Sequence, residues 1–136
     1  MHLAECVRAS GDGGAIWVCG LAEGWAPAFY AAGARGFTSG LVNVAPAHSL
    51  AIWRALETGR FDEARSLIAT IAPFEAMRTK HNNGANVTVV KEALMLEGWA
   101  VGPVRLPGLP RLADSDREAL ARILANLSAA TAKAAE

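Results

Sequence analysis

The order of elements in residues 15–40 limits the possible folds more than any other feature of the sequence. The run AIWVCG at 15–20 is short, apolar and closed by a glycine, which predicts a strand buried on both faces. Residues 21–33 place apolar side chains at helical spacing, with the regular part starting near Pro27, and GFTSG at 36–40 predicts a second strand. A helical crossover between two strands of one sheet requires those strands to be parallel.

The rest of the chain is predicted to be mostly helical. Leu50, Trp53 and Leu56 should form the apolar face of a helix that starts at Pro46. Pro73 should bend or break the next helix, and Ser115 with Glu118 should form a capping box for the last one. The expected helices cover 2–9, 46–59, 61–74, 87–98 and the residues after 115, with a loop at 81–86, an extended segment at 101–112 and frayed residues at 128–136.

A parallel sheet of only two strands would leave both of its outer edges unpaired. Parallel sheets normally contain more strands and are covered by helices. We therefore expect the missing strands to lie upstream of Met1 in a longer parent, or in another chain. Small polar residues at the end of the second strand favour the last quarter of a (β/α)8 barrel, where functional groups gather at the carboxyl ends of the strands. A doubly wound α/β sheet is the alternative.

Composition excludes several classes of protein. The chain has 136 residues, 52% apolar and 19% charged, as expected of a globular domain with one core. Thirteen basic residues balance thirteen acidic ones, so neither nucleic acid nor a membrane surface is an expected partner. Cys6 and Cys19 form no metal-binding pattern and are expected to be reduced thiols. Without a signal sequence or a membrane-spanning run, we expect a cytoplasmic protein. We also expect it to use no metal and no cofactor.

Four segments in this order resemble one family of enzymes. The most specific of their features are the glycine-ended strand, the G-x-x-S-x-x-x-N-x-x-P run that starts at Gly36, and a late K-x-x-L and R-L-P combination. Their order and spacing resemble the C-terminal half of the dihydrodipicolinate synthase / N-acetylneuraminate lyase family, over nearly the whole chain. The segments are WVCGLAEGWAPAFYAAGARGFTSGLVNVAP at 17–46, ALETGRFDEA at 55–64, NVTVVKEALMLEG at 86–98 and GPVRLPGLPRL at 102–112.

The resemblance implies a TIM barrel with extra C-terminal helices that acts on 2-keto acids through a Schiff base. In such enzymes a lysine amine attacks the substrate carbonyl, and the iminium that forms is the electron sink for bond making or breaking beside it. In the family this lysine lies on the sixth strand and a tyrosine on the fifth, both before the matched segment, so Met1 would be an internal methionine of a longer reading frame. The implied domains are 1–59, the last β/α units of a partial barrel, and 60–136, a C-terminal helical extension.

Five residues are expected to shape the substrate pocket rather than to perform the chemistry. The resemblance places Gly20 at the end of the seventh barrel strand and Thr38 on the eighth, where the backbone closes over the bound keto acid. Ser39 and Asn43 would support that strand end or its loop. Glu23 could contact a sugar hydroxyl or simply cap its helix, and both interpretations stay open. The Ala-Glu spelling at this position and the GPVR segment favour the sugar-acid dehydratase branch over aldol-type enzymes.

Several other residues have both a functional and a structural interpretation. Lys91 is the lone lysine in the apolar run VTVVKEAL, but its place on a late helix favours packing over a Schiff-base role. Arg105 is expected to pair with a carboxylate or cap carbonyls. His48 is expected to be a solvated residue at a helix start rather than a ligand contact. The four tryptophans are expected to be buried in the core or at a subunit contact.

Two functions therefore remain. The chain is either the C-terminal fragment of a Schiff-base lyase, inactive without its first half, or a non-catalytic half-barrel or helical module that self-associates. In both cases the open sheet edges predict a homo-oligomer or a complementing chain.

Overall fold

The computed structural model of the chain describes residues 2–11 and 13–133, with side chains up to residue 129. The fold divides into two compact units, which are described separately. Unit 1 is Met1–Ser39 with Ser49–Ile68, and unit 2 is Gly40–His48 with Ala69–Glu136. The predicted domains, 1–59 and 60–136, stay a prediction.

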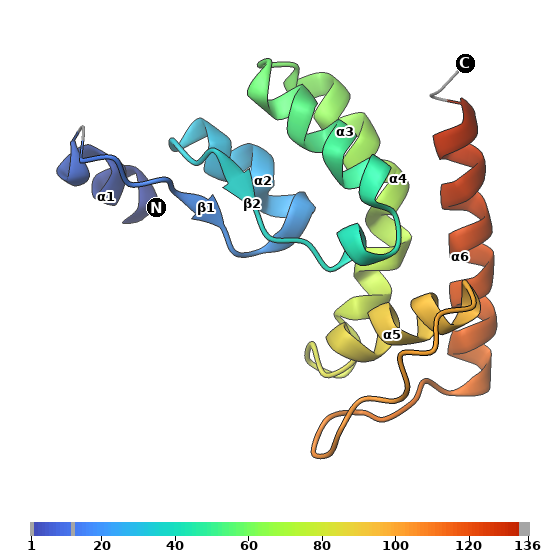
Figure 1. Ribbon diagram of the computed structural model, residues 1–136. Helices are drawn as coiled ribbons and strands as arrows, with labels where there is room; N and C mark the ends of the chain where they lie inside the picture. Colours follow the sequence, from blue (N-terminus) through green and yellow to red (C-terminus); the bar gives the residue numbers. More distant parts are fainter. Residues whose placement is uncertain (1, 12, 134–136) are drawn as a thin grey trace. The chain divides into compact units, whose positions relative to one another are not determined.

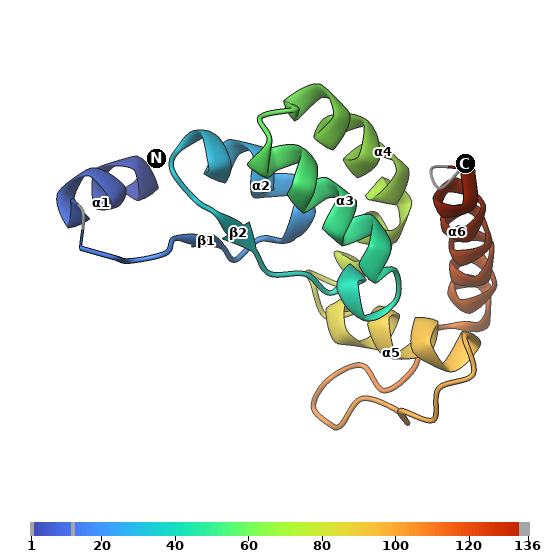
Figure 2. The ribbon, with the colours of Figure 1, turned by 45° about the horizontal axis from the view of Figure 1, so that its top comes forward.

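Unit 1 contains the predicted strand-helix-strand motif. Helix α1 (His2–Ser10) precedes β1 (Val18–Cys19), α2 (Ala22–Ala31) and β2 (Gly36–Phe37). The two strands are parallel, and both views show them side by side with α2 against them (Figures 1 and 2). A backbone hydrogen bond of 2.8 Å from Thr38 N to Cys19 O continues the pairing past the end of β2. The parallel β-α-β prediction is confirmed.

The first strand is shorter and more exposed than its apolar sequence predicted. Only Val18 and Cys19 belong to β1, and only Cys19 is buried. Ile16 is 77% exposed and Val18 48%, so the prediction of a strand buried on both faces is wrong for this chain. The physical reason is that the sheet has just two strands within the described residues, so that both of its outer edges lack a neighbouring strand.

Helix α2 begins earlier than predicted and buries a different face. It starts at Ala22 and contains Pro27, so the prediction that its regular part begins near this proline is wrong. Leu21 and Trp25, two of the apolar residues whose spacing predicted this helix, are 56% and 60% exposed. The side chains that α2 buries are Glu23, Ala26 and Tyr30.

Helices α3 (Pro46–Glu57) and α4 (Phe61–Arg78) follow, and each has residues in both units. Leu50 and Trp53 are 45% and 39% exposed, whereas Leu56, predicted to share their apolar face, is 3% exposed. Helix α4 does not end at Pro73, so a break there is also wrong. Core burial of the tryptophans is wrong for Trp25, Trp53 and Trp99, the last of which is 66% exposed. Along the core side of unit 1, α3 instead places Ser49, Ile52, Ala55 and Leu56.

Unit 2 adds the short 3-10 helix η1 (Leu41–Asn43), α5 (Asn86–Leu96) and α6 (Asp114–Lys133). Helix α5 contacts η1 and α6, and a long irregular segment at 97–113, orange in Figure 2, joins α5 to α6. The capping-box prediction is wrong because Ser115 lies inside α6 and does not flank its start. The helix begins at Asp114, and the backbone N–H of Arg117 donates to Ala113 O at 2.9 Å. Fraying was predicted for 128–136, but α6 is helical to Lys133 and residues 134–136 lie outside the described part of the chain.

Arg78 ties together three segments of unit 2. Its guanidinium donates to Glu75 Oε1 at 2.6 Å and to Asn86 Oδ1 from Nη2 at 2.6 Å, and its exposed fraction is 8%. Gly40 lies directly against this guanidinium, and a Cβ at that position would collide with it. The glycine therefore allows the backbone to approach a buried charged group.

None of the described helices combines the length and apolar character needed to cross a membrane.

Candidate functional site

A buried carboxylate lies just past the carboxyl ends of both strands of unit 1. Glu23 is fully buried in the first turn of α2. Its Oε1 accepts hydrogen bonds from the Ser39 hydroxyl, just past β2, and from the Ser49 hydroxyl of α3, the latter at 2.6 Å. The two hydroxyl oxygens are 3.3 Å apart. Three segments that are distant in the sequence therefore converge on one carboxylate oxygen.

The second oxygen of Glu23 has a different environment. Oε2 is buried and has no hydrogen-bond partner within the part of the chain that the structure describes. An ionised oxygen without a partner in a buried place costs free energy, and native structures contain few such groups. Because both known bonds of the side chain go to serine hydroxyls rather than to backbone N–H groups, simple capping of α2 does not account for its position.

The backbone next to Glu23 is also unusual. Ala22 has a φ of 63°, in the left-handed region that residues with a Cβ rarely adopt. Such strain persists only where surrounding structure enforces it, and it is concentrated at functional sites. The strained residue is the first residue of α2 and directly precedes the buried carboxylate.

The other predicted pocket residues lie at strand ends or in the following loop. The backbone N–H of Thr38 donates a hydrogen bond to Cys19 O, and the Thr38 side chain is exposed. Gly20 follows β1 and has open space where a Cβ would lie. Asn43 belongs to unit 2, and its side-chain amide donates to Gly40 O at 3.1 Å within its own loop. The structure therefore joins Glu23 with Ser39 and places Gly20 and Thr38 on the same paired strand ends.

Two buried titratable groups accompany the site in unit 1. Burial, opposed in part by a backbone hydrogen bond and reinforced by the Glu23 charge, raises the pKa of the Cys19 thiol. Burial and the nearby Glu57 carboxylate raise the pKa of Tyr30 to about 12. Both groups are therefore neutral near pH 7, and the Cys19 thiol is a poor nucleophile there.

No group of three potential metal-ligating side chains occurs among the described residues.

Ser49 is a site residue that the sequence did not reveal. It lies three residues before Ile52 and seven before Leu56, on the buried face of α3. A hydroxyl at a buried helix position needs a hydrogen-bond partner, and this spacing is the signal that could have marked it.

The alternative functional residues have mainly structural roles. His48 is 5% exposed, and its Nε2 lies 2.7 Å from Thr70 Oγ1, so the prediction of a solvated histidine is wrong. Lys91 donates to Pro103 O at 3.0 Å, which agrees with packing rather than catalysis. Arg105 is exposed, and the predicted pairing of its guanidinium is not seen within the described residues.

Comparison with known proteins assigns the chain to a family. The model of the dihydrodipicolinate synthetase family matches residues 1–127, and the chain belongs to that family. A solved dihydrodipicolinate synthase from Oceanobacillus iheyensis is 41% identical, with a TM-score of 0.86, over 93% of this chain and 42% of that one. The predicted resemblance and fold class, the C-terminal part of a (β/α)8 barrel with added helices, are confirmed.

Two of the sequence relatives are named for different enzymes. One from Chelativorans sp. (strain BNC1), named "Probable 5-dehydro-4-deoxyglucarate dehydratase", is 32% identical over 107 residues, which are 78% of this chain and 35% of that protein. A 4-hydroxy-tetrahydrodipicolinate synthase from Syntrophus aciditrophicus (strain SB) is 36% identical over 95 residues, which are 69% of this chain and 31% of that protein. The chain therefore spans about a third of the length of these curated relatives.

Proposed function

We propose that this chain forms the C-terminal part of a Schiff-base lyase that dehydrates a 2-keto-3-deoxy sugar acid. The observation that carries the proposal is the Glu23 carboxylate, which is fully buried at the strand ends with Oε1 held by two serines and Oε2 without a partner among the described residues. A sugar acid offers hydroxyl groups that could donate to such an oxygen. The dehydratase name of the Chelativorans relative supports the same branch.

In this proposal the chain recognises and positions the substrate. Ser39 and Ser49 fix the orientation of Glu23, so that Oε2 accepts a hydrogen bond from a substrate hydroxyl. The strand ends at Gly20 and Thr38 form one wall of the pocket. The lysine that forms the Schiff base comes from a strand outside this chain. Its iminium makes the C–H bond of the adjacent carbon acidic, and the enamine that forms when this proton leaves expels the hydroxyl of the next carbon, so that proton and hydroxyl leave together as water.

A chimera tests the proposal directly. This chain replaces the matched segment of the Chelativorans relative, and consumption of 5-dehydro-4-deoxyglucarate is measured. We expect activity, and we expect Glu23→Gln to lower kcat/KM about tenfold to a hundredfold, because a hydrogen bond to a charged group contributes roughly 1.5–3 kcal/mol.

The matched control is Glu97→Gln, which neutralises an exposed carboxylate just after α5. It should leave kcat/KM unchanged. Full activity of the Glu23→Gln chimera would show that Glu23 does not bind the substrate. A folded chimera that is active only in the synthase reaction would assign the chain to the aldol-type branch.

A second measurement addresses the chain by itself. Treatment with pyruvate and borohydride, followed by intact mass, traps any Schiff base. We expect no adduct, because Lys91 donates to Pro103 O and belongs to a helix rather than to a barrel strand. A specific adduct at Lys91 would show that the chain carries its own catalytic amine.

A non-catalytic, self-associating module is the second candidate, and one observation favours it. Ile16, Leu21 and Trp25 of the β1-α2 segment are 77%, 56% and 60% exposed, which is unusual for large apolar side chains so close in sequence. This candidate predicts a sedimentation coefficient that rises with concentration and a smaller rise after Trp25→Ser. A monomer at all concentrations would exclude it.

A further inference from the structure

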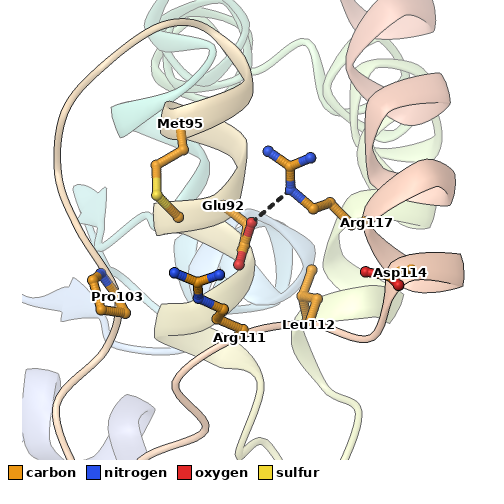
Figure 3. Close-up of a pocket in the computed structure, with 7 residues that line it drawn as sticks. All are labelled: Glu92, Met95, Pro103, Arg111, Leu112, Asp114 and Arg117. Atoms are coloured by element: carbon orange, nitrogen blue, oxygen red, sulfur yellow. Dashed lines mark hydrogen bonds and ion pairs between the residues drawn. The ribbon is translucent and has the colours of Figure 1, made fainter.

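A separate pocket of unit 2 has the chemistry of a ligand site. It has a volume of about 350 Å³ and lies between α5, the irregular segment before α6, and the first turns of α6 (Figure 3). Its apolar lining comes from Met95, Pro103 and Leu112. Its charged lining comes from Glu92, Arg111, Asp114 and Arg117. None of these residues belongs to the proposed lyase site, and the inference does not rest on the proposed function.

One arginine of the pocket is held in a fixed orientation. Glu92 is only 3% exposed, and its Oε2 accepts a hydrogen bond of 3.0 Å from Arg117 Nε. This bond uses one edge of the guanidinium. The terminal amino groups of Arg117 have no hydrogen-bond partner among the described residues, and in Figure 3 they lie on the side of the guanidinium away from Glu92. A guanidinium anchored through Nε presents two parallel donors to a planar acceptor.

A second arginine faces the same space. Arg111 is exposed in the segment before α6, and no hydrogen bond from its guanidinium is found within the described residues. In Figure 3 its guanidinium lies on the opposite side of the Glu92 carboxylate from that of Arg117. Two guanidinium groups therefore flank one buried carboxylate, which leaves one positive charge in excess around Glu92.

The remaining acidic residue does not cancel this excess locally. Asp114 is the first residue of α6, where the positive end of the helix dipole compensates a carboxylate. In the view of Figure 3 the Leu112 side chain lies between Asp114 and Arg111. The excess charge and the apolar wall together define the class of ligand: a single negative charge next to a short apolar body. A dianion would carry more negative charge than the one positive charge that the two arginines leave in excess around Glu92.

We propose that this pocket binds a small monocarboxylate. The carboxylate oxygens accept hydrogen bonds from the terminal amino groups of Arg117 and Arg111, and the aliphatic body packs on Met95, Leu112 and Pro103. Glu92 is a positioning residue, because it orients Arg117 without contacting the ligand.

The test is a titration of the 136-residue chain with butyrate, followed by amide NMR at about 0.15 M salt. We expect saturable shifts at residues 95 and 111–117. Butyramide, which has the same shape without the charge, should bind at least about tenfold more weakly, because a charge-assisted hydrogen bond is about twice as strong as a neutral one and two arginines are involved.

Variants show whether the two arginines carry the affinity. Arg111→Gln and Arg117→Gln should each raise the Kd for butyrate about tenfold. Arg122→Gln is the matched control, because it removes an exposed arginine of α6 that does not line the pocket. Equal shifts with butyramide, a linear response without saturation, or the same loss with Arg122→Gln would overturn the proposal.

Discussion

Replacement of Ser49 by alanine tests whether the carboxylate network in unit 1 contributes to stability. The Ser49 hydroxyl donates to Glu23 Oε1 at 2.6 Å, and both residues are buried. A hydrogen bond to a charged group contributes about 1.5–3 kcal/mol to the free energy of unfolding. Alanine recovers about 0.5 kcal/mol through its higher helix propensity. We therefore expect Ser49→Ala to lower the free energy of unfolding by about 1–2.5 kcal/mol.

The assay is urea unfolding followed by tryptophan fluorescence, which reports on unit 1 through Trp17, Trp25 and Trp53. Ser66→Ala is the matched control: Ser66 is also a helical serine of unit 1, but it is exposed and bonds only Asp62 O. The control should change stability by less than about 0.5 kcal/mol. An equal effect of the two substitutions would refute the network.

A double-mutant cycle sharpens the same prediction. In a Glu23→Gln background the Ser49 hydroxyl donates to a neutral amide oxygen. Because charge-assisted hydrogen bonds are roughly twice as strong as neutral ones, the cost of Ser49→Ala should fall to about half. An unchanged cost would mean that Ser49 stabilises α3 for a reason unrelated to Glu23.

Three further predictions follow from the other buried groups. Gly40→Ala should lower the free energy of unfolding by about 1–3 kcal/mol in urea titrations, since its Cβ would displace the Arg78 guanidinium; unchanged stability would contradict this packing. In the native chain iodoacetamide should alkylate exposed Cys6 and spare Cys19, whose buried thiol has a raised pKa; equal rates by peptide mass would contradict its burial. Because burial raises the pKa of Tyr30 from 10.0 to about 12, the unfolded chain loses this proton first, so stability should fall as pH rises from 10 to 12; replacement by Phe should weaken that fall.

The Glu23 oxygen that has no partner among the described residues connects stability to function. A carboxylate that is buried with one oxygen unsatisfied is costly in the absence of a ligand, and the strained φ of Ala22 beside it adds to that cost. Both features are expected where an oxygen is reserved for a substrate hydroxyl. A ligand that donates to Oε2 should therefore raise the thermal stability of unit 1 in the chimera.

Local sequence patterns determined the order and direction of the elements. Glycines after apolar runs marked where the strands and helices end, and the helix between two strand patterns required a parallel pair. The order and spacing of four segments, one of which contains Gly36, Ser39 and Pro46, also indicated the family. These signals act over a few residues, so they can be read without knowing what lies nearby in space.

Tertiary structure decided which side chains are buried and what they contact. Helical spacing predicted burial of Trp25 and Trp53, but no described element covers their exposed surfaces, whereas Glu23 is buried because Ser39 and Ser49 come to it from 16 and 26 residues away. The buried pairing of His48 with Thr70 likewise joins residues 22 apart. Burial depends on contacts with distant segments, and a pattern within one segment carries no information about them. The sequence therefore determined the elements and the family, and only the folded chain determined the site.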